Sequence, residues 1–169
     1  APELLVSAPG ASNPFDPTCQ QRGRVYVYRT RPSTGITEPV PWQILDLRTP
    51  VNAAYTEARG QHSLECASNR PGAGRGLQWF DFDADGRKDL LVSVVPESWE
   101  SNRGTVLVYR GKAPGEAQPF DPTPSWAIVL APELQAINGS EQKWAQGMDL
   151  VRDVVGGTEV LVVRGYTVD

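Results

Sequence analysis

The chain has 169 residues, 40% of them hydrophobic, with 16 glycines, 15 prolines and a formal net charge of −4. This length can bury a core of single-domain size, and the many glycines and prolines indicate short elements separated by turns. The acidic balance, with no basic stripe, argues against nucleic acid as a partner. No apolar run approaches the roughly 18 residues of a membrane-spanning helix, so we expect no membrane span.

Short segments rich in β-branched and aromatic residues predict strands along the chain. The first three predicted strands are residues 3–9, 23–29 and 41–45. No segment shows a sustained helical period. The sequence therefore predicts an all-β fold.

These three segments recur later in the chain, as residues 89–96, 104–110 and 125–129, with Trp42 matched to Trp126. A weaker third copy is formed by residues 147–151 and 159–163. A period of roughly 70 to 86 residues with four short strands per unit is typical of propeller blades. Because the two tryptophans are matched in the repeat, we expect them to pack in the core or between blades.

The repeat predicts one domain, residues 1–169, made of β-propeller blades that are four-stranded antiparallel sheets. The blade units cover about residues 3–47, 77–131 and, in part, 147–169. About two blade periods form only an incomplete propeller, because open blades leave strand edges and apolar faces exposed. We expect a piece of a larger protein, with further blades or further chains completing the ring. A compact β-sandwich is the alternative fold.

Residues 81–89 read D-F-D-A-D-G-R-K-D, with carboxylates at positions 1, 3, 5 and 9 and a glycine at position 6. The candidate metal ligands are the side chains of Asp81, Asp83, Asp85 and Asp89, joined by the backbone carbonyl of Arg87. Alternate residues of a curled loop can point inward together, and Gly86 permits the sharp turn that brings in the carbonyl.

An all-oxygen shell suits a hard cation, and calcium tolerates irregular geometry better than magnesium does. We therefore expect Ca²⁺ at this loop; a solvated acidic turn without metal is the alternative. The loop is not an EF-hand, because Val92 stands where that loop has its bidentate glutamate. The apolar, β-branched flanks indicate that the loop joins two strands.

The pattern D-x-D-x-D-G-x-x-D-L-L-V, followed by G-x-V-x-V-Y, resembles the FG-GAP repeat of integrin α-subunit β-propellers and their bacterial relatives. The match covers most of residues 3–30 and 77–110 and, more faintly, 147–164. The resemblance implies calcium on one face of the propeller and ligand-binding loops on the opposite face. It also implies a secreted or cell-surface protein that serves adhesion or ligand binding.

Two other functions remain open: a lectin or enzyme domain on a propeller scaffold, and a structural subunit of an extracellular assembly. The clustered carboxylates are accounted for by the metal, and no acid/base pair is evident in a cleft. The single histidine, His62, has no catalytic motif around it. We therefore expect no enzymatic activity.

The units are not equivalent as metal sites. In the third unit, Val151 and Val155 stand where the calcium loop has Asp81 and Asp85. We expect no calcium there. In the first unit, Glu3 corresponds to Asp89, so a metal loop of that unit would precede the chain.

Long connectors at residues 10–22, 48–75, 96–103 and 133–143 lie, by repeat phase, on the face opposite the calcium loop. Trp99, Glu100 and Arg103 are the candidate contacts there with a protein or carbohydrate ligand. Cys19 and Cys66 lie in two of these connectors, so a disulfide between them is geometrically allowed, with two free thiols as the alternative. Such a bridge would suit an extracellular location.

Overall fold

The computed structural model describes residues 3–8, 23–31, 33–35, 37–47, 71–96, 105–129, 141–152 and 159–168. Within these ranges the chain forms β-strands and no helix, which confirms the all-β prediction. The described part therefore contains no helix long and apolar enough to cross a membrane. The strands are β1 (Glu3–Ala8), β2 (Arg24–Arg29), β3 (Gln43–Asp46), β4 (Pro71–Phe80), β5 (Asp89–Pro96), β6 (Thr105–Tyr109), β7 (Trp126–Val129), β8 (Glu141–Arg152) and β9 (Glu159–Val168).

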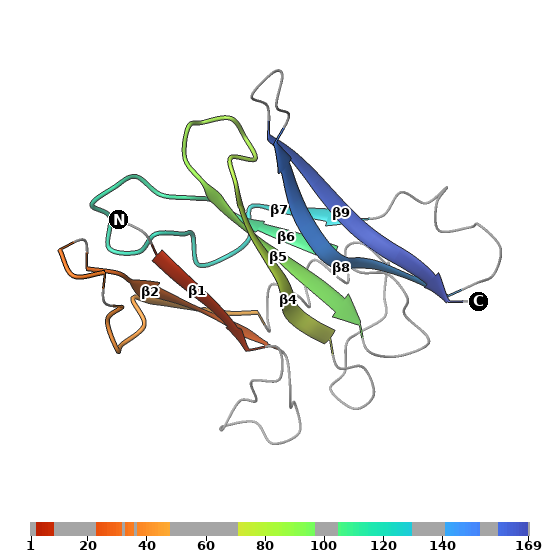
Figure 1. Ribbon diagram of the computed structural model, residues 1–169, viewed down its shortest axis with the longest axis horizontal. Coiled ribbons are helices and arrows are strands. Elements are labelled where there is room, and N and C mark those ends of the chain that lie inside the picture. The colour runs from red at the N-terminus through yellow and green to blue at the C-terminus, as the bar shows by residue number, and fades with distance from the viewer. Residues whose placement is uncertain are drawn as a thin grey trace.

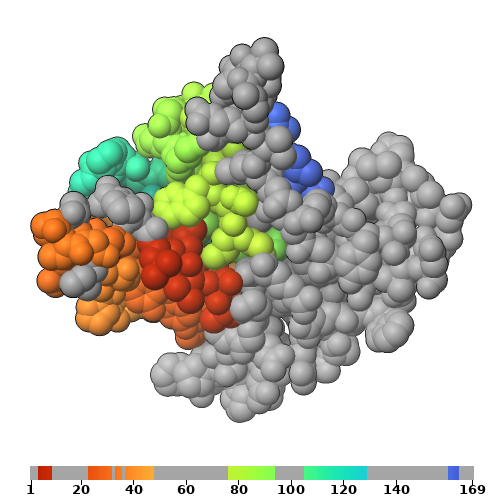
Figure 2. All heavy atoms as spheres, viewed as in Figure 1, coloured from red at the N-terminus to blue at the C-terminus, as the bar shows by residue number. Residues whose placement is uncertain are grey.

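The strands form three antiparallel sheets in chain order: β1-β2-β3, β4-β5-β6-β7 and β8-β9. Strands that follow one another are hydrogen-bonded neighbours, as expected of a meander. Figure 1 shows the first sheet (red to orange) and β8-β9 (blue) on opposite sides of the four-stranded sheet (green to cyan). In the space-filling view, β1 (red) lies directly against yellow-green residues that include the second half of β4 (Figure 2).

The main core lies between the first and second sheets. Alternation along β2 points Val25 and Val27 to one face, where both are fully buried. They pack against residues of the second sheet that are also fully buried, namely Leu90, Val92, Leu107 and Tyr109. Burial raises the pKa of the Tyr109 hydroxyl above its ordinary value, and this hydroxyl has no hydrogen-bond partner.

A second core lies on the other face of the four-stranded sheet. Leu91, Val106 and Val108 are fully buried there, and Leu161 and Val163 of β9 pack against them. As a result every residue of β6 is buried, whichever face its side chain occupies. The middle sheet is thus covered on both faces, as an internal layer of a stack of sheets would be.

The first and second sheets use equivalent repeat positions in the same way. Val25 and Val27 face the following sheet, and their repeat counterparts Val106 and Val108 also face the following sheet. The other face is partly exposed in the first sheet and buried in the second. Leu4 and Val6 on the outer face of the first sheet are 45% and 41% exposed, whereas their counterparts in the second sheet, Leu90 and Val92, are fully buried.

In the third sheet, the residues that face the preceding sheet are not the ones that the repeat predicts. The repeat aligns Glu159 with Asp89, which would turn Val160 and Val162 toward the preceding sheet. Instead Leu161 and Val163 face it, and Val160 is 48% exposed. Since side chains alternate along a strand, a shift of one residue between repeat and strand is enough to exchange the two faces.

This packing predicts which face of β9 tolerates charge. Leu161→Lys should lower the free energy of unfolding by about 2 kcal/mol, because the ammonium would enter an apolar layer. Val162→Lys is the matched control on the other face and should cost less than about 0.5 kcal/mol. Urea unfolding of both variants measures the difference. A larger loss for Val162→Lys would mean that β9 packs as the repeat aligns it.

Two sequence expectations on the strands need correction. Residues 71–75 were expected to lie in a connector, but β4 begins at Pro71 and pairs with β5 on both sides of an irregularity between Ala73 and Leu77. Ser93 Oγ accepts a 2.6 Å hydrogen bond from the backbone N–H of Gly76 within this irregular stretch. A side-chain acceptor there satisfies an N–H that the disrupted ladder leaves free, which lets the strand continue.

The repeat match of Trp42 with Trp126 is also offset by one residue. Gln43 pairs with Val27, whereas Trp126 pairs with the counterpart of Val27, Val108. Trp42 stacks on Arg29, with the guanidinium 3.7 Å from the ring centroid, and its Nε1 donates a 2.7 Å hydrogen bond to the carbonyl of Ala117. Trp42 therefore links the first unit to the second. Trp126 packs against Phe82, with the ring centroids 5.4 Å apart.

Several predicted features lie outside the described residues. They are Cys19 and Cys66, the candidate contacts Trp99, Glu100 and Arg103, and His62. Of the four long connectors, only residues 71–75, residue 96 and residues 141–143 are described, and all of them belong to strands. The proposed disulfide and ligand contacts remain predictions.

Candidate metal centre

The acidic loop connects β4 to β5 as an irregular hairpin loop. Phe80 and Asp89 form the last strand pair, so residues 81–88 lie between the strands. Two residues of this loop have left-handed backbone conformations, Ala84 with φ of 59° and Gly86 with φ of 85°. Glycine adopts that conformation without steric cost, which explains its place at the second of these turns.

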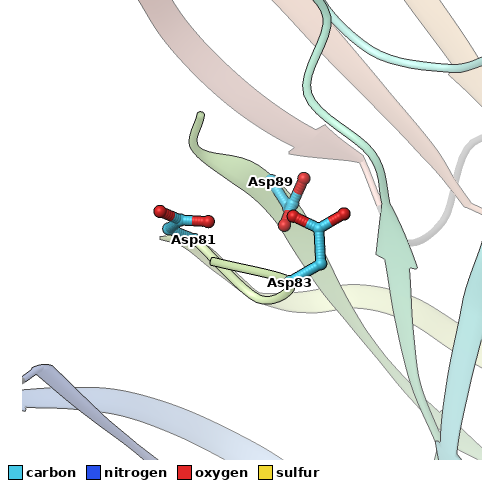
Figure 3. Close-up of side chains that lie close together, drawn as sticks. All are labelled: Asp81, Asp83 and Asp89. Carbon is cyan, nitrogen blue, oxygen red and sulfur yellow. The ribbon is translucent and has the colours of Figure 1, made fainter. Parts of the chain in front are cut away.

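Three carboxylates converge at this loop. Oxygens of Asp81, Asp83 and Asp89 all lie within 4.8 Å of one another. Figure 3 shows the carboxylate of Asp83 beside that of Asp89, with Asp81 on the other side of the loop. This group can hold a metal ion, and it contains three of the four predicted carboxylate ligands.

Asp89 is fixed by the fold. Its side chain is fully buried at the first position of β5. One carboxylate oxygen accepts a 2.8 Å hydrogen bond from the backbone N–H of Phe82, and the other accepts one of 2.8 Å from Gly111. These bonds orient both oxygens and tie the acidic loop to the segment that follows β6.

Gly111 was not recognised from the sequence as part of this site. It is buried, and a Cβ at this position would overlap the backbone carbonyl of Lys88. Only glycine therefore lets the backbone after β6 approach the acidic loop closely enough to donate to Asp89. The sequence signal was a glycine directly after the strand ending in Tyr109 and Arg110.

The two carboxylate oxygens of Asp81 differ in their hydrogen bonding. Its Oδ2 accepts a 3.0 Å hydrogen bond from the N–H of Gly86, across the turn. Its Oδ1 is buried and has no hydrogen-bond partner. A buried carboxylate oxygen with neither donor nor solvent is costly, and a bound cation is one way to satisfy it.

Asp85 has a different environment from the other three carboxylates. Its Oδ1 accepts a 2.9 Å hydrogen bond from the N–H of Arg87, and its Oδ2 contacts the Arg87 guanidinium. Nη2 of Arg110 lies 3.1 Å from the same Oδ2. These contacts, with the Arg87 side chain contributing most, hold the pKa of the Asp85 carboxyl below its ordinary value. The same pairing raises the pKa of Arg87.

Asp83 belongs to the converging group and also pairs with Arg110. Its Oδ1 accepts a 3.2 Å hydrogen bond from the N–H of Asp85, and its Oδ2 is 2.9 Å from Nη2 of Arg110. Arg110 thus contacts both Asp83 and Asp85 from the end of β6. The predicted role of the Arg87 carbonyl as a fifth ligand stays a prediction.

The donor atoms of the group are all carboxylate oxygens, which suits a hard cation. Three like charges at this separation repel by roughly 1 kcal/mol per pair in water, and by more where they are shielded from solvent. Asp89 and Asp81 Oδ1 are buried, so the repulsion that involves them is stronger than it would be in water. A divalent cation would replace this repulsion with attraction.

No protein-family model matches the chain, and no curated protein is detectably similar to it in sequence. The resemblance to the FG-GAP repeat therefore rests on the quoted residues alone.

Proposed function

We propose that the chain is a calcium-binding β-propeller segment of a secreted or cell-surface protein that mediates adhesion or ligand binding. The observation that carries the metal part is Asp81 Oδ1, a buried charged oxygen without a hydrogen-bond partner. It belongs to the same group as Asp83 and the fully buried Asp89. The cation's role is structural: it neutralises this group and holds the β4–β5 loop against the segment after β6.

Calcium fits the loop better than magnesium does. Calcium accepts six to eight oxygens in flexible geometry, whereas magnesium demands a near-ideal octahedron and gives up its waters reluctantly. The left-handed turns at Ala84 and Gly86 give the loop an irregular path. In the proposed shell, Asp81, Asp83 and Asp89 are joined by the Asp85 side chain and the Arg87 carbonyl.

The stacking of the first two sheets supports the propeller part of the proposal. Equivalent positions of both sheets face the same way along the stack, as successive blades do. The exposed Leu4, Val6 and Ile44 on the outer face of the first sheet form an apolar surface, which another sheet would cover. This surface also favours the second candidate function, a subunit whose blades join those of neighbouring chains.

The ligand, protein or carbohydrate, is proposed to bind on the face opposite the calcium loop. Trp99, Glu100 and Arg103 are the proposed contacts, and a Cys19–Cys66 disulfide would fit the same extracellular setting. This role is one of binding, without enzymatic activity.

The calcium part is tested by thermal unfolding with and without calcium. At a calcium concentration of about 100 times Kd, binding to the native state alone should add about 2.7 kcal/mol of stability. For a chain of this size that corresponds to a rise in Tm of about 5–10 °C. Equal magnesium should raise Tm less, and Asp83→Ala should abolish the calcium response. An unchanged Tm on adding calcium to the chelator-treated protein would contradict the proposal.

A further inference from the structure

Arg110 is a basic residue that reaches the acidic loop from outside it. It follows β6, 21 residues after Asp89 in the chain, and its Nη2 contacts Asp83 at 2.9 Å and Asp85 at 3.1 Å. The side chain is 44% exposed, whereas those of Asp83 and Asp85 are 19% and 18% exposed. The guanidinium therefore covers the solvent side of two carboxylates of the proposed shell.

The ion pairs of Arg110 oppose the binding of a cation at the loop. Asp83 belongs to the converging group, and Asp85 is the fourth carboxylate of the proposed shell. The Arg110 guanidinium pairs with Oδ2 of Asp83 and with Oδ2 of Asp85. It therefore repels a divalent cation and occupies lone pairs of these oxygens that the cation would use. Asp85 can turn toward a cation only if it leaves Arg110 and Arg87.

We propose that Arg110 is a built-in competitor of the cation, which sets the affinity of the loop by pairing with Asp83 and Asp85. Cation binding displaces the Arg110 guanidinium, and Asp85 completes the shell once it has left both Arg110 and Arg87. Arg110 is then free on the surface beside the loop. The inference rests on the proposed function, because it concerns the affinity of the same site.

The backbone next to Arg110 does not need to move in this exchange. Gly111 is fixed against the loop by its bond to Asp89, and Asp121 N–H donates a 3.0 Å hydrogen bond to the Arg110 carbonyl. Only the long side chain swings. The competition is therefore a side-chain ion-pair exchange, which costs little compared with a change of fold.

The test compares calcium affinity in Arg110→Gln with the unaltered protein by isothermal titration calorimetry. Kd for calcium should fall about tenfold at low salt, because a positive charge near a divalent cation is removed. At about 0.5 M salt the difference should shrink, since salt screens exposed ion pairs. Arg31→Gln is the matched control: Arg31 pairs with Glu38 at 3.7 Å, and its loss should change Kd less than twofold.

Thermal unfolding separates this role from a merely structural one. Without calcium, Arg110→Gln should lower Tm, because Asp83 and Asp85 lose their counter-charge. The rise in Tm on adding calcium should then be larger than in the unaltered protein. A structural role alone would lower Tm equally in both conditions. Arg110→Lys keeps the charge without the planar fork and should give an intermediate Kd, and it serves if the glutamine variant fails to fold.

An equal or weaker calcium affinity in Arg110→Gln, with calcium binding intact in the unaltered protein, would overturn the competition while leaving the metal site. If the unaltered protein itself takes up no calcium, the proposed function fails and the competition falls with it. The two failures are therefore distinguished by the titration of the unaltered protein.

Discussion

Asp89→Ala should lower the free energy of unfolding by about 2 to 5 kcal/mol in the presence of a chelator. The fully buried carboxylate accepts from Phe82 and Gly111, so its removal leaves two N–H donors without their acceptor. Loss of repulsion from Asp81 and Asp83 offsets part of this cost. The variant should also lose any stabilisation by calcium. Urea unfolding with and without calcium measures both effects.

Asp83→Ala is the matched comparison from the same carboxylate group. Its side chain is 19% exposed, and its partners, the Asp85 N–H and Arg110, lie at or near the surface. It should therefore lose the calcium response while costing less than about 1 kcal/mol in chelator. Equal losses for the two variants in chelator would show that Asp89 does not tie the loop to the segment after β6.

Gln43→Leu should lower the free energy of unfolding by about 2 to 4 kcal/mol. The buried side-chain amide of Gln43 donates 2.9 Å to the carbonyl of Phe120 and accepts 3.1 Å from its N–H. It thereby pairs β3 with the segment between β6 and β7, much as a strand would. Leucine would leave both backbone groups of Phe120 buried and unpaired.

Gln118→Leu is the control for the loss of a neighbouring amide. Gln118 is exposed, and its Oε1 lies 3.5 Å from Nε2 of Gln43. Its replacement should change stability by less than about 0.5 kcal/mol. Chemical unfolding of both variants gives the comparison. A loss below about 1 kcal/mol for Gln43→Leu would mean that water replaces the amide at the sheet interface.

The hairpin strands and the acidic loop could be predicted from the sequence because their signals are local. Alternation along residues 24–29 and the apolar run after Asp89 define strands by themselves. The spacing of Asp81, Asp83 and Asp89 likewise predicts that they point inward, and they do converge. The inward orientation of aspartates at alternate positions follows from local spacing, so it can be predicted from the sequence of the loop alone.

The parts that could not be predicted depend on contacts between distant segments. Gly111 and Arg110 join the site only because β6 pairs with β5 and ends beside the loop. Asp85 was expected among the ligands, but a spacing rule does not reveal the two guanidiniums that it faces. The offset at β9 has the same origin, because which face a strand buries is decided by its neighbour rather than by its own alternation.

The third unit also differs in loop length. Arg152 and Glu159 are the last pair of β8 and β9, which leaves six residues between them, against the eight between Phe80 and Asp89. A repeat alignment that keeps the same spacing in both units cannot match these two hairpins. The expectation of no calcium at residues 151–159 remains a prediction.

The most direct measurement is a calorimetric titration of the chelator-treated, 169-residue chain with calcium. The proposal predicts uptake of about one calcium ion per chain, since one loop supplies the oxygen shell. Asp81→Asn, which removes the charge behind the buried oxygen, should weaken binding at least about tenfold by loss of that electrostatic attraction. Absence of calcium uptake, or equal uptake by Asp81→Asn, would contradict a calcium site at this loop.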